Sequence, residues 1–231
     1  MDYRGRGRSD YANDWKTYHP LQELADAILL LDRLAIDRVA VIGTSRGGII
    51  AMLMASLHAD RLAGALLNDI GPRIDIAGLF RLANTVGRAD TFKSWDAAID
   101  ALKRTSPGFE SLSEREWRDF AARLFRETPA GIRYDYDARL VQGLPPTPVD
   151  ADALPELWTY FAALVPKPAA VLRAEHSDFL SVETVDRMKA MHPRLIAATV
   201  MDRGHVPFLD EPESRAVITE WLAACDAIGG H

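Results

Sequence analysis

The sequence predicts an α/β fold, in which a mostly parallel sheet is flanked by helices and interrupted by a helical cap. Two observations support this prediction. Short apolar or β-branched runs alternate with longer segments of helical periodicity, which is typical of a parallel sheet covered on both faces. The alternation stops after residue 72 and resumes at residue 165, so a block of helical pattern separates two halves of one α/β unit.

The first half of the chain, residues 1–72, shows the pattern of two helices and two strands. Apolar positions recur at helical spacing after Pro20, and proline is favoured in the first turn of a helix. The runs that follow are apolar, and clusters of turn-forming residues separate them. In chain order we expect helix 21–31, strand 38–42, helix 49–57 and strand 62–67.

The middle of the chain, residues 73–164, shows helical patterns without a convincing strand, and we interpret it as a cap. Its clearest helix begins at Ser113, which can form a capping box with Glu116. Trp95, Trp117 and Phe120 could line a substrate pocket in this cap, although aromatic residues at helical spacing more often belong to a core.

The last part of the chain, residues 165–231, returns to the alternating pattern of the first half. Its apolar runs are short where strands are expected, and its final segment carries a helical apolar stripe. In chain order we expect strand 169–173, helix 181–191, strand 195–201 and a helix that includes 217–225.

The composition is that of a globular protein and excludes several functions. Lys and Arg number 27 and Asp and Glu 33, and a net charge of −6 over 231 residues argues against a nucleic-acid partner. The single cysteine, Cys225, can form neither an internal disulfide nor a zinc knuckle. Residues 1–15 lack the apolar core of a signal peptide, and no apolar stretch could span a bilayer. We therefore expect a cytoplasmic protein without a membrane partner; the sequence leaves a homo-oligomer open.

The segment Gly43-Thr44-Ser45-Arg46-Gly47 matches G-x-S-x-G between an expected strand and an expected helix. This is the setting of a nucleophile elbow, a strained turn in which side chains at the two glycines would collide with neighbouring backbone. Ser45 is therefore the expected catalytic nucleophile. The backbone N–H of Arg46, at the start of the helix, is the expected donor to an oxyanion.

A serine hydroxyl needs a base, and the base needs an acid that orients it. His205 follows the last expected strand, at the same sheet edge as Ser45, and is the expected base. Asp178 follows the preceding strand and is the expected acid. Glu175, one turn earlier, and Asp69, after strand 62–67, are the alternatives.

Four motifs in this order resemble those of the α/β-hydrolase superfamily. They are D-x-R-G-x-G-x-S at 2–9, G-x-S-x-G at 43–47, Ser-Asp at 177–178 and Gly-His at 204–205. The resemblance covers nearly the whole chain and implies the α/β-hydrolase fold. The implied division is a core of residues 1–72 and 165–231 with a helical cap of residues 73–164.

The resemblance also implies a cofactor-independent enzyme that cleaves a small-molecule ester, a lactone or a carbon–carbon bond of a ring-fission product. Epoxide hydrolases and haloalkane dehalogenases carry an acid where this chain has Ser45, which argues against both. No Walker A, H-E-x-x-H or dinucleotide-binding motif is present, and we expect neither a metal nor another cofactor.

The chain departs from the superfamily at its beginning. The strands that precede the D-x-R-G-x-G-x-S turn in the superfamily have no counterpart, so we expect an N-terminally truncated version of the fold. The run 38–42 should then lie at a sheet edge, and the loop that supplies the second oxyanion N–H should be missing. A second hypothesis is therefore a ligand-binding protein of this fold without catalysis, or an inactive fragment of an enzyme.

Overall fold

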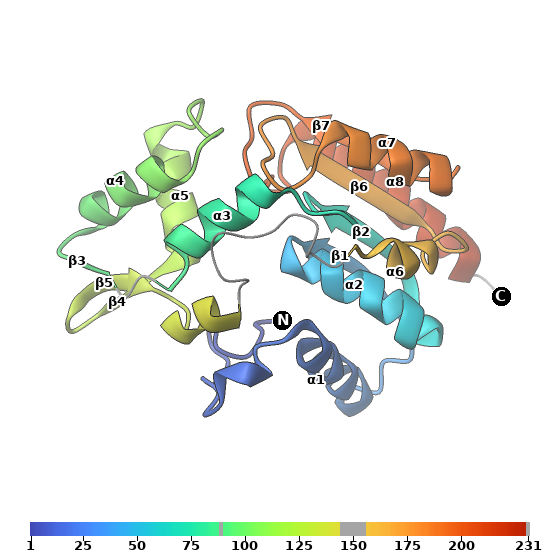
Figure 1. Cartoon of the computed structure of the whole chain (residues 1–231), viewed down its shortest axis with the longest axis horizontal. Coiled ribbons are helices and arrows are strands. Elements are labelled where there is room, and N and C mark those ends of the chain that lie inside the picture. The colour runs from blue at the N-terminus through green and yellow to red at the C-terminus, as the bar shows by residue number, and fades with distance from the viewer. Residues whose placement is uncertain (88–89, 144–155, 230–231) are drawn as a thin grey trace.

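The computed structural model describes residues 1–87, 90–143 and 156–229, and these residues form a parallel sheet with helices on both faces and a separate helical lobe (Figure 1). The main sheet has four parallel strands in the order β1-β2-β6-β7. Their bounds are Val39–Thr44 for β1, Leu62–Asn68 for β2, Ala169–Ala174 for β6 and Ile196–Val200 for β7.

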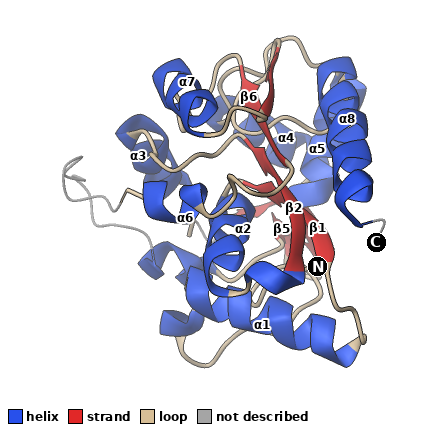
Figure 2. Cartoon of the chain, turned by 90° about the vertical axis from the view of Figure 1, so that its right-hand side faces the viewer, coloured by secondary structure: helices blue, strands red, loops and turns tan. Residues whose placement is uncertain are grey.

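The two faces of the sheet have different helical covers (Figure 2). Ala65 and Leu67 point into a core shared with α2 (Arg46–Leu57), α6 (Trp158–Ala162) and α7 (Val182–Met191). Leu66, between them, packs against α8 (Pro212–Gly229) on the opposite face. Side chains alternate across a strand, so both faces of the apolar strand β2 are buried. The predicted parallel sheet flanked by helices is confirmed.

The eight elements expected outside the cap are all present. Helix α1 spans Pro20–Arg33 and packs against α2. The other seven are the four strands of the sheet and the helices α2, α7 and α8. Short 3-10 helices lie at Trp15–Thr17, Ala59–Arg61 and Ala138–Gly143. Within the described part of the chain, β1 pairs with β2 alone, so it lies at the expected edge, and Ile42 is 42% exposed there.

The lobe at the left of Figure 1 contains α4 (Trp95–Thr105) and α5 (Glu114–Leu124). Helix α3 (Ile76–Thr85) lies between this lobe and the sheet, and its Leu79 and Leu82 pack against the core shared with α2. The expected capping box of Ser113 and Glu116 starts α5. The expectation of no strands here is wrong. An antiparallel sheet in the order β3-β5-β4 is formed by Thr91–Phe92, Gly131–Tyr134 and Phe125–Thr128. These strands have two to four residues, too few to show an alternating pattern in the sequence.

The lobe has its own apolar core. Phe109, Trp117, Phe125 and Ile132 are buried together in it. Helix α6, by contrast, packs against α2 in the core beneath the sheet, although it falls within residues 73–164. Among the described residues no helix has both the length and the hydropathy that crossing a bilayer requires.

Candidate active site

Ser45 lies in the sharp turn between the end of β1 and the first residue of α2. Its backbone has φ +49° and ψ −117°, a conformation that residues other than glycine rarely adopt. The Ser45 N–H donates to the carbonyl of Asn68 at the end of β2, 3.0 Å away, which fixes the turn to the sheet. The strain and the anchor together present the hydroxyl at the carboxyl ends of the strands.

The glycines around Ser45 show why the turn needs them. A Cβ on Gly43 would lie 2.6 Å from the backbone of Gly47, which no side chain could tolerate. The expectation for Gly47 itself is wrong, since a Cβ there would meet only the Tyr3 hydroxyl at 3.6 Å. The crowded position is Gly48, where a Cβ would lie 2.2 Å from the side chain of Ile70.

His205 lies in the loop between β7 and α8, and its ring reaches the expected serine. Its Nε2 is 2.8 Å from the Ser45 Oγ. The ring stacks on Phe179, with 3.9 Å between the centroids and 20° between the planes. The His205 side chain is only 9% exposed, so packing as well as hydrogen bonding holds the ring.

The carboxylate that meets His205 belongs to Asp69. Its Oδ2 lies 2.8 Å from the His205 Nδ1, and the side chain is fully buried at the end of β2. The backbone N–H of Ala174 donates to Oδ1 and the Ser177 hydroxyl donates to Oδ2, each at 2.8 Å. A carboxylate only accepts, so this network assigns the ring proton to Nδ1 and leaves Nε2 free to accept from Ser45.

The expectation that Asp178 would orient His205 is wrong. The Asp178 carboxylate accepts two hydrogen bonds from Arg81 of α3, at 2.5 Å and 2.9 Å. Burial alone would raise the pKa of Asp178, but the hydrogen bonds and the charge of Arg81 outweigh it and lower that pKa. Because this ion pair occupies both oxygens, the carboxylate serves to join α3 to the loop after β6.

Glu175, the other alternative, also makes contacts away from the His205 ring. Its carboxylate accepts from the Asp202 N–H at 3.0 Å and lies 3.5 Å from the His176 ring. Glu175, His176 and Asp202 bring potential metal-ligand atoms within 4.8 Å of one another. These side chains are exposed or half-buried, and no further ligand of the described residues accompanies them, so we do not include a metal in the site.

The comparisons with known proteins identify the family of the chain. The model of the alpha/beta hydrolase family matches residues 1–216 of the chain. The chain belongs to the α/β hydrolase family. A 3-hydroxybutyrate-oligomer hydrolase of Cupriavidus necator is 30% identical over 227 residues, an alignment that covers 96% of this chain and 77% of that relative.

Solved structures of other hydrolases have the same fold. An alpha/beta hydrolase from Novosphingobium aromaticivorans is 38% identical with a TM-score of 0.88, and the match covers 96% of this chain and 78% of that one. An E-2-(acetamidomethylene)succinate hydrolase is 20% identical with a TM-score of 0.77, covering 96% and 80% of the two chains. At that identity the second likeness concerns the fold alone.

In this α/β hydrolase the expected oxyanion donor is the backbone N–H of Arg46. Arg46 is the first residue of α2, so its N–H has no acceptor within the helix. Its side chain turns away from Ser45, donating to Glu23 of α1 at 2.5 Å and to the carbonyl of Tyr18 at 2.7 Å. These contacts hold the first turn of α2, and with it the N–H, against α1.

The three aromatic residues expected at the pocket lie in different surroundings. Trp117 is 5% exposed in the core of the lobe, and Trp95 at the start of α4 is 36% exposed. Phe120 is half-buried, and its ring contacts Phe208, three residues beyond His205, with centroids 4.9 Å apart. Of the three, Phe120 is the one connected to the loop that carries His205.

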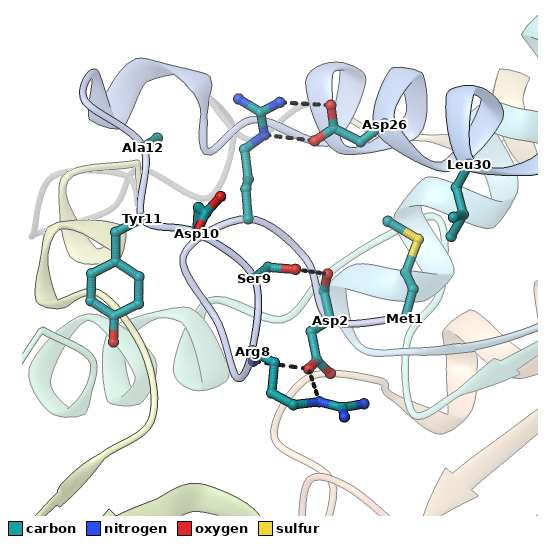
Figure 3. A pocket seen from close by; sticks show the side chains of 10 residues that line it. Met1, Asp2, Arg8, Ser9, Asp10, Tyr11, Ala12, Asp26 and Leu30 are labelled. Atoms are coloured by element: carbon teal, nitrogen blue, oxygen red, sulfur yellow. Dashed lines mark hydrogen bonds and ion pairs between the residues drawn. The ribbon is translucent and has the colours of Figure 1, made fainter. Parts of the chain in front are cut away.

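A hollow of about 710 Å³ lies elsewhere, between the first residues of the chain and α1 (Figure 3). Arg4 lines it and is held by two hydrogen bonds to Asp26, and Arg8 lies beside Asp2. Ser45, Asp69 and His205 do not line this hollow. The chemistry of the site therefore does not extend into it.

Proposed function

We propose that this α/β hydrolase is a cofactor-independent serine hydrolase that cleaves carboxylic esters through an acyl-enzyme. The observation that carries the proposal is the hydrogen-bonded chain from Ser45 through His205 to the buried Asp69. Such a chain activates a hydroxyl that would otherwise be a poor nucleophile at neutral pH.

In the proposed reaction His205 Nε2 takes the proton of Ser45 as Oγ attacks the ester carbonyl. Asp69 stays ionised and stabilises the imidazolium that forms. The Arg46 N–H donates to the oxyanion of the tetrahedral intermediate. The intermediate collapses, the leaving alkoxide takes the proton from His205, and the acid part remains bound to Ser45. His205 then takes a proton from water as the water oxygen attacks the acyl carbonyl. The second tetrahedral intermediate collapses as His205 returns that proton to Ser45 Oγ, and the acid is released.

For the substrate we propose a small ester of a hydroxy acid. The relative from Cupriavidus necator, whose name states that it hydrolyses 3-hydroxybutyrate oligomers, supports an ester over a lactone or a carbon–carbon bond. An ester fits the proposed mechanism, because its alcohol is a leaving group that one proton from His205 suffices to release.

A fluorophosphonate probe tests the proposal, because it labels only an activated serine. We expect labelling of the wild-type chain and none of Ser45→Ala or His205→Gln. Ser9→Ala, which changes a serine of the N-terminal turn remote from His205, should be labelled like wild type. A folded wild-type chain that remains unlabelled and turns over no p-nitrophenyl ester would favour the alternative, a ligand-binding protein of the same fold.

A further inference from the structure

Two guanidinium groups share one buried carboxylate near the nucleophile. Glu23 of α1 is fully buried and accepts from Arg46 Nε at 2.5 Å and from Arg6 Nη1 at 3.2 Å. The single negative charge of Glu23 therefore faces the positive charges of Arg46 and Arg6. The three side chains together carry one net positive charge at a half-buried position. Burial is the main reason that the pKa of Arg6 is lowered, and the charge of Arg46 adds to the effect.

Most of the Arg6 guanidinium has no partner. Nη1 makes its bond to Glu23 and a long one, 3.4 Å, to the carbonyl of Arg4. Nε and Nη2 donate to no atom of the residues that the structure describes, although the side chain is only 31% exposed. A planar guanidinium with two free N–H directions, partly removed from water, is suited to binding a carboxylate through two parallel hydrogen bonds.

The free side of Arg6 is accompanied by a free hydroxyl. Tyr3 lies under the Arg6 guanidinium, 5.9 Å from ring centroid to Cζ, and its hydroxyl forms no hydrogen bond within the described part of the chain. The same hydroxyl is the nearest atom to the open side of Gly47, 3.6 Å from where a Cβ would lie. Gly47 is two residues beyond Ser45, so Tyr3 and Arg6 flank the start of α2.

Arg6 also touches the lobe. Its backbone forms an isolated antiparallel bridge with Tyr136, just after β5. Arg6, which shares the single charge of Glu23 with Arg46, therefore connects the N-terminal segment, the first turn of α2 and the lobe.

We propose that Arg6 and Tyr3 bind a free carboxylate of the substrate, so that the enzyme selects esters of hydroxy acids that keep an unesterified acid end. The inference rests on the proposed ester hydrolysis at Ser45. The carboxylate would balance the spare positive charge, accepting from the two free nitrogens of Arg6 and from the Tyr3 hydroxyl. A neutral ester of the same shape would leave these donors unpaired.

The test compares two substrates that differ in this one group, the linear dimer of 3-hydroxybutyrate and its methyl ester. For wild type we expect kcat/KM to be at least about tenfold higher for the free acid. Arg6→Gln should reduce this ratio by roughly 10- to 100-fold, mainly through KM, since charged hydrogen bonds are lost on binding. Tyr3→Phe should reduce it by a smaller factor. Arg8→Gln, on the same turn but 98% exposed, should keep the wild-type ratio.

Equal kcat/KM values for acid and methyl ester in wild type would overturn the inference while leaving ester hydrolysis intact, as would an unchanged ratio in Arg6→Gln. Arg6→Lys keeps the positive charge beside Glu23 and so distinguishes a loss of carboxylate binding from a loss of folding. Its ratio of kcat/KM for acid over methyl ester should lie between those of wild type and Arg6→Gln. If wild type cleaves neither ester, ester hydrolysis is refuted and calorimetric titration with 3-hydroxybutyrate decides the inference. Binding that Arg6→Gln weakens at least tenfold would support it, and no binding would overturn it.

Discussion

Asp69 is a fully buried charge that three donors stabilise. Burying an ionised carboxylate is costly unless its oxygens are hydrogen-bonded, and here they accept from a ring, a hydroxyl and a backbone N–H. The Ser177 hydroxyl is itself oriented, because it accepts from the N–H groups of Phe179 and Leu180 at 3.2 Å and 3.0 Å. The carboxylate therefore has one orientation, and it imposes that orientation on His205.

The first prediction separates the two aspartates. Asp69→Asn should lower kcat for a p-nitrophenyl ester by about 10³–10⁴-fold, because the amide leaves His205 in the wrong tautomer. Asp178→Asn should lower kcat far less, since it weakens a contact to Arg81 rather than a contact to the His205 ring. Circular dichroism spectra of both variants serve as the folding control. A nearly normal rate for Asp69→Asn beside an inactive Asp178→Asn would reverse the assignment.

At the scale of single residues the sequence could predict Ser45 and His205 but not the acid. Ser45 lies in a motif whose glycines indicate a tight turn, and His205 follows the last strand. Asp69 and Asp178 both follow strands, and either one gives the chain order serine, acid, histidine. What decides between them is Arg81, 97 residues from Asp178, and no local pattern reveals that ion pair.

The loop between β7 and α8 is held in shape by one buried glutamate. The Glu211 carboxylate accepts from the N–H groups of Phe208 and Leu209 and from the side chains of Arg203 and Ser214. Burial alone would raise the pKa of Glu211, but these hydrogen bonds outweigh it and lower that pKa. The loop ends on either side of His205 are thus fixed before any substrate binds.

The second prediction concerns the first turn of α2. Gly48→Ala should lower the free energy of unfolding by about 1–3 kcal/mol, because the new Cβ would lie 2.2 Å from Ile70 and 3.1 Å from the Gly43 carbonyl. Gly47→Ala should be neutral or stabilising by up to about 1 kcal/mol, because helical alanine is favoured and the space is open. Urea unfolding of both variants measures the difference. Equal destabilisation by the two would refute this account of the turn.

At the scale of elements, long patterns were predictable and short ones were not. Helix α5 was predictable because its cap and its apolar stripe both lie within a dozen residues. Strands β4 and β5 have four residues each, joined by a tight turn at Gly131, whose φ is +123°. The burial of Phe125 and Ile132 depends on contacts with the rest of the lobe core, so the local sequence does not predict these strands.

For the whole molecule, polar contacts join the N-terminal segment to the lobe. The Tyr18 hydroxyl donates to Asp137 Oδ2 at 2.5 Å, across 119 positions of the sequence. Arg139 binds the same carboxylate and donates to the carbonyl of Ala12 at 2.6 Å. Beside this connection the backbone of Arg6 pairs with Tyr136. The N-terminal segment is therefore joined to the lobe by polar contacts around one buried carboxylate.

That charge makes the attachment sensitive to acid. Burial would raise the pKa of Asp137, but the hydrogen bonds from Arg139 and Tyr18 outweigh it and lower that pKa from 3.8 to about 2. A carboxyl whose folded pKa lies below its unfolded pKa stabilises the fold above the unfolded value. That stabilisation is lost as the pH falls through the folded value. The relevant window therefore runs from about pH 4 down to about pH 2.

The third prediction follows from this window. At pH 7 Asp137→Asn should lower the free energy of unfolding by about 1–3 kcal/mol, because Arg139 and the Tyr18 hydroxyl lose a charged acceptor. The difference from wild type should shrink as the pH falls from 4 to 2, where the wild-type carboxyl becomes protonated too. Urea unfolding at each pH measures it, with the exposed Asp100→Asn on α4 as the matched control. A difference that stayed constant across that range would show that Asp137 acts through its shape and not through its charge.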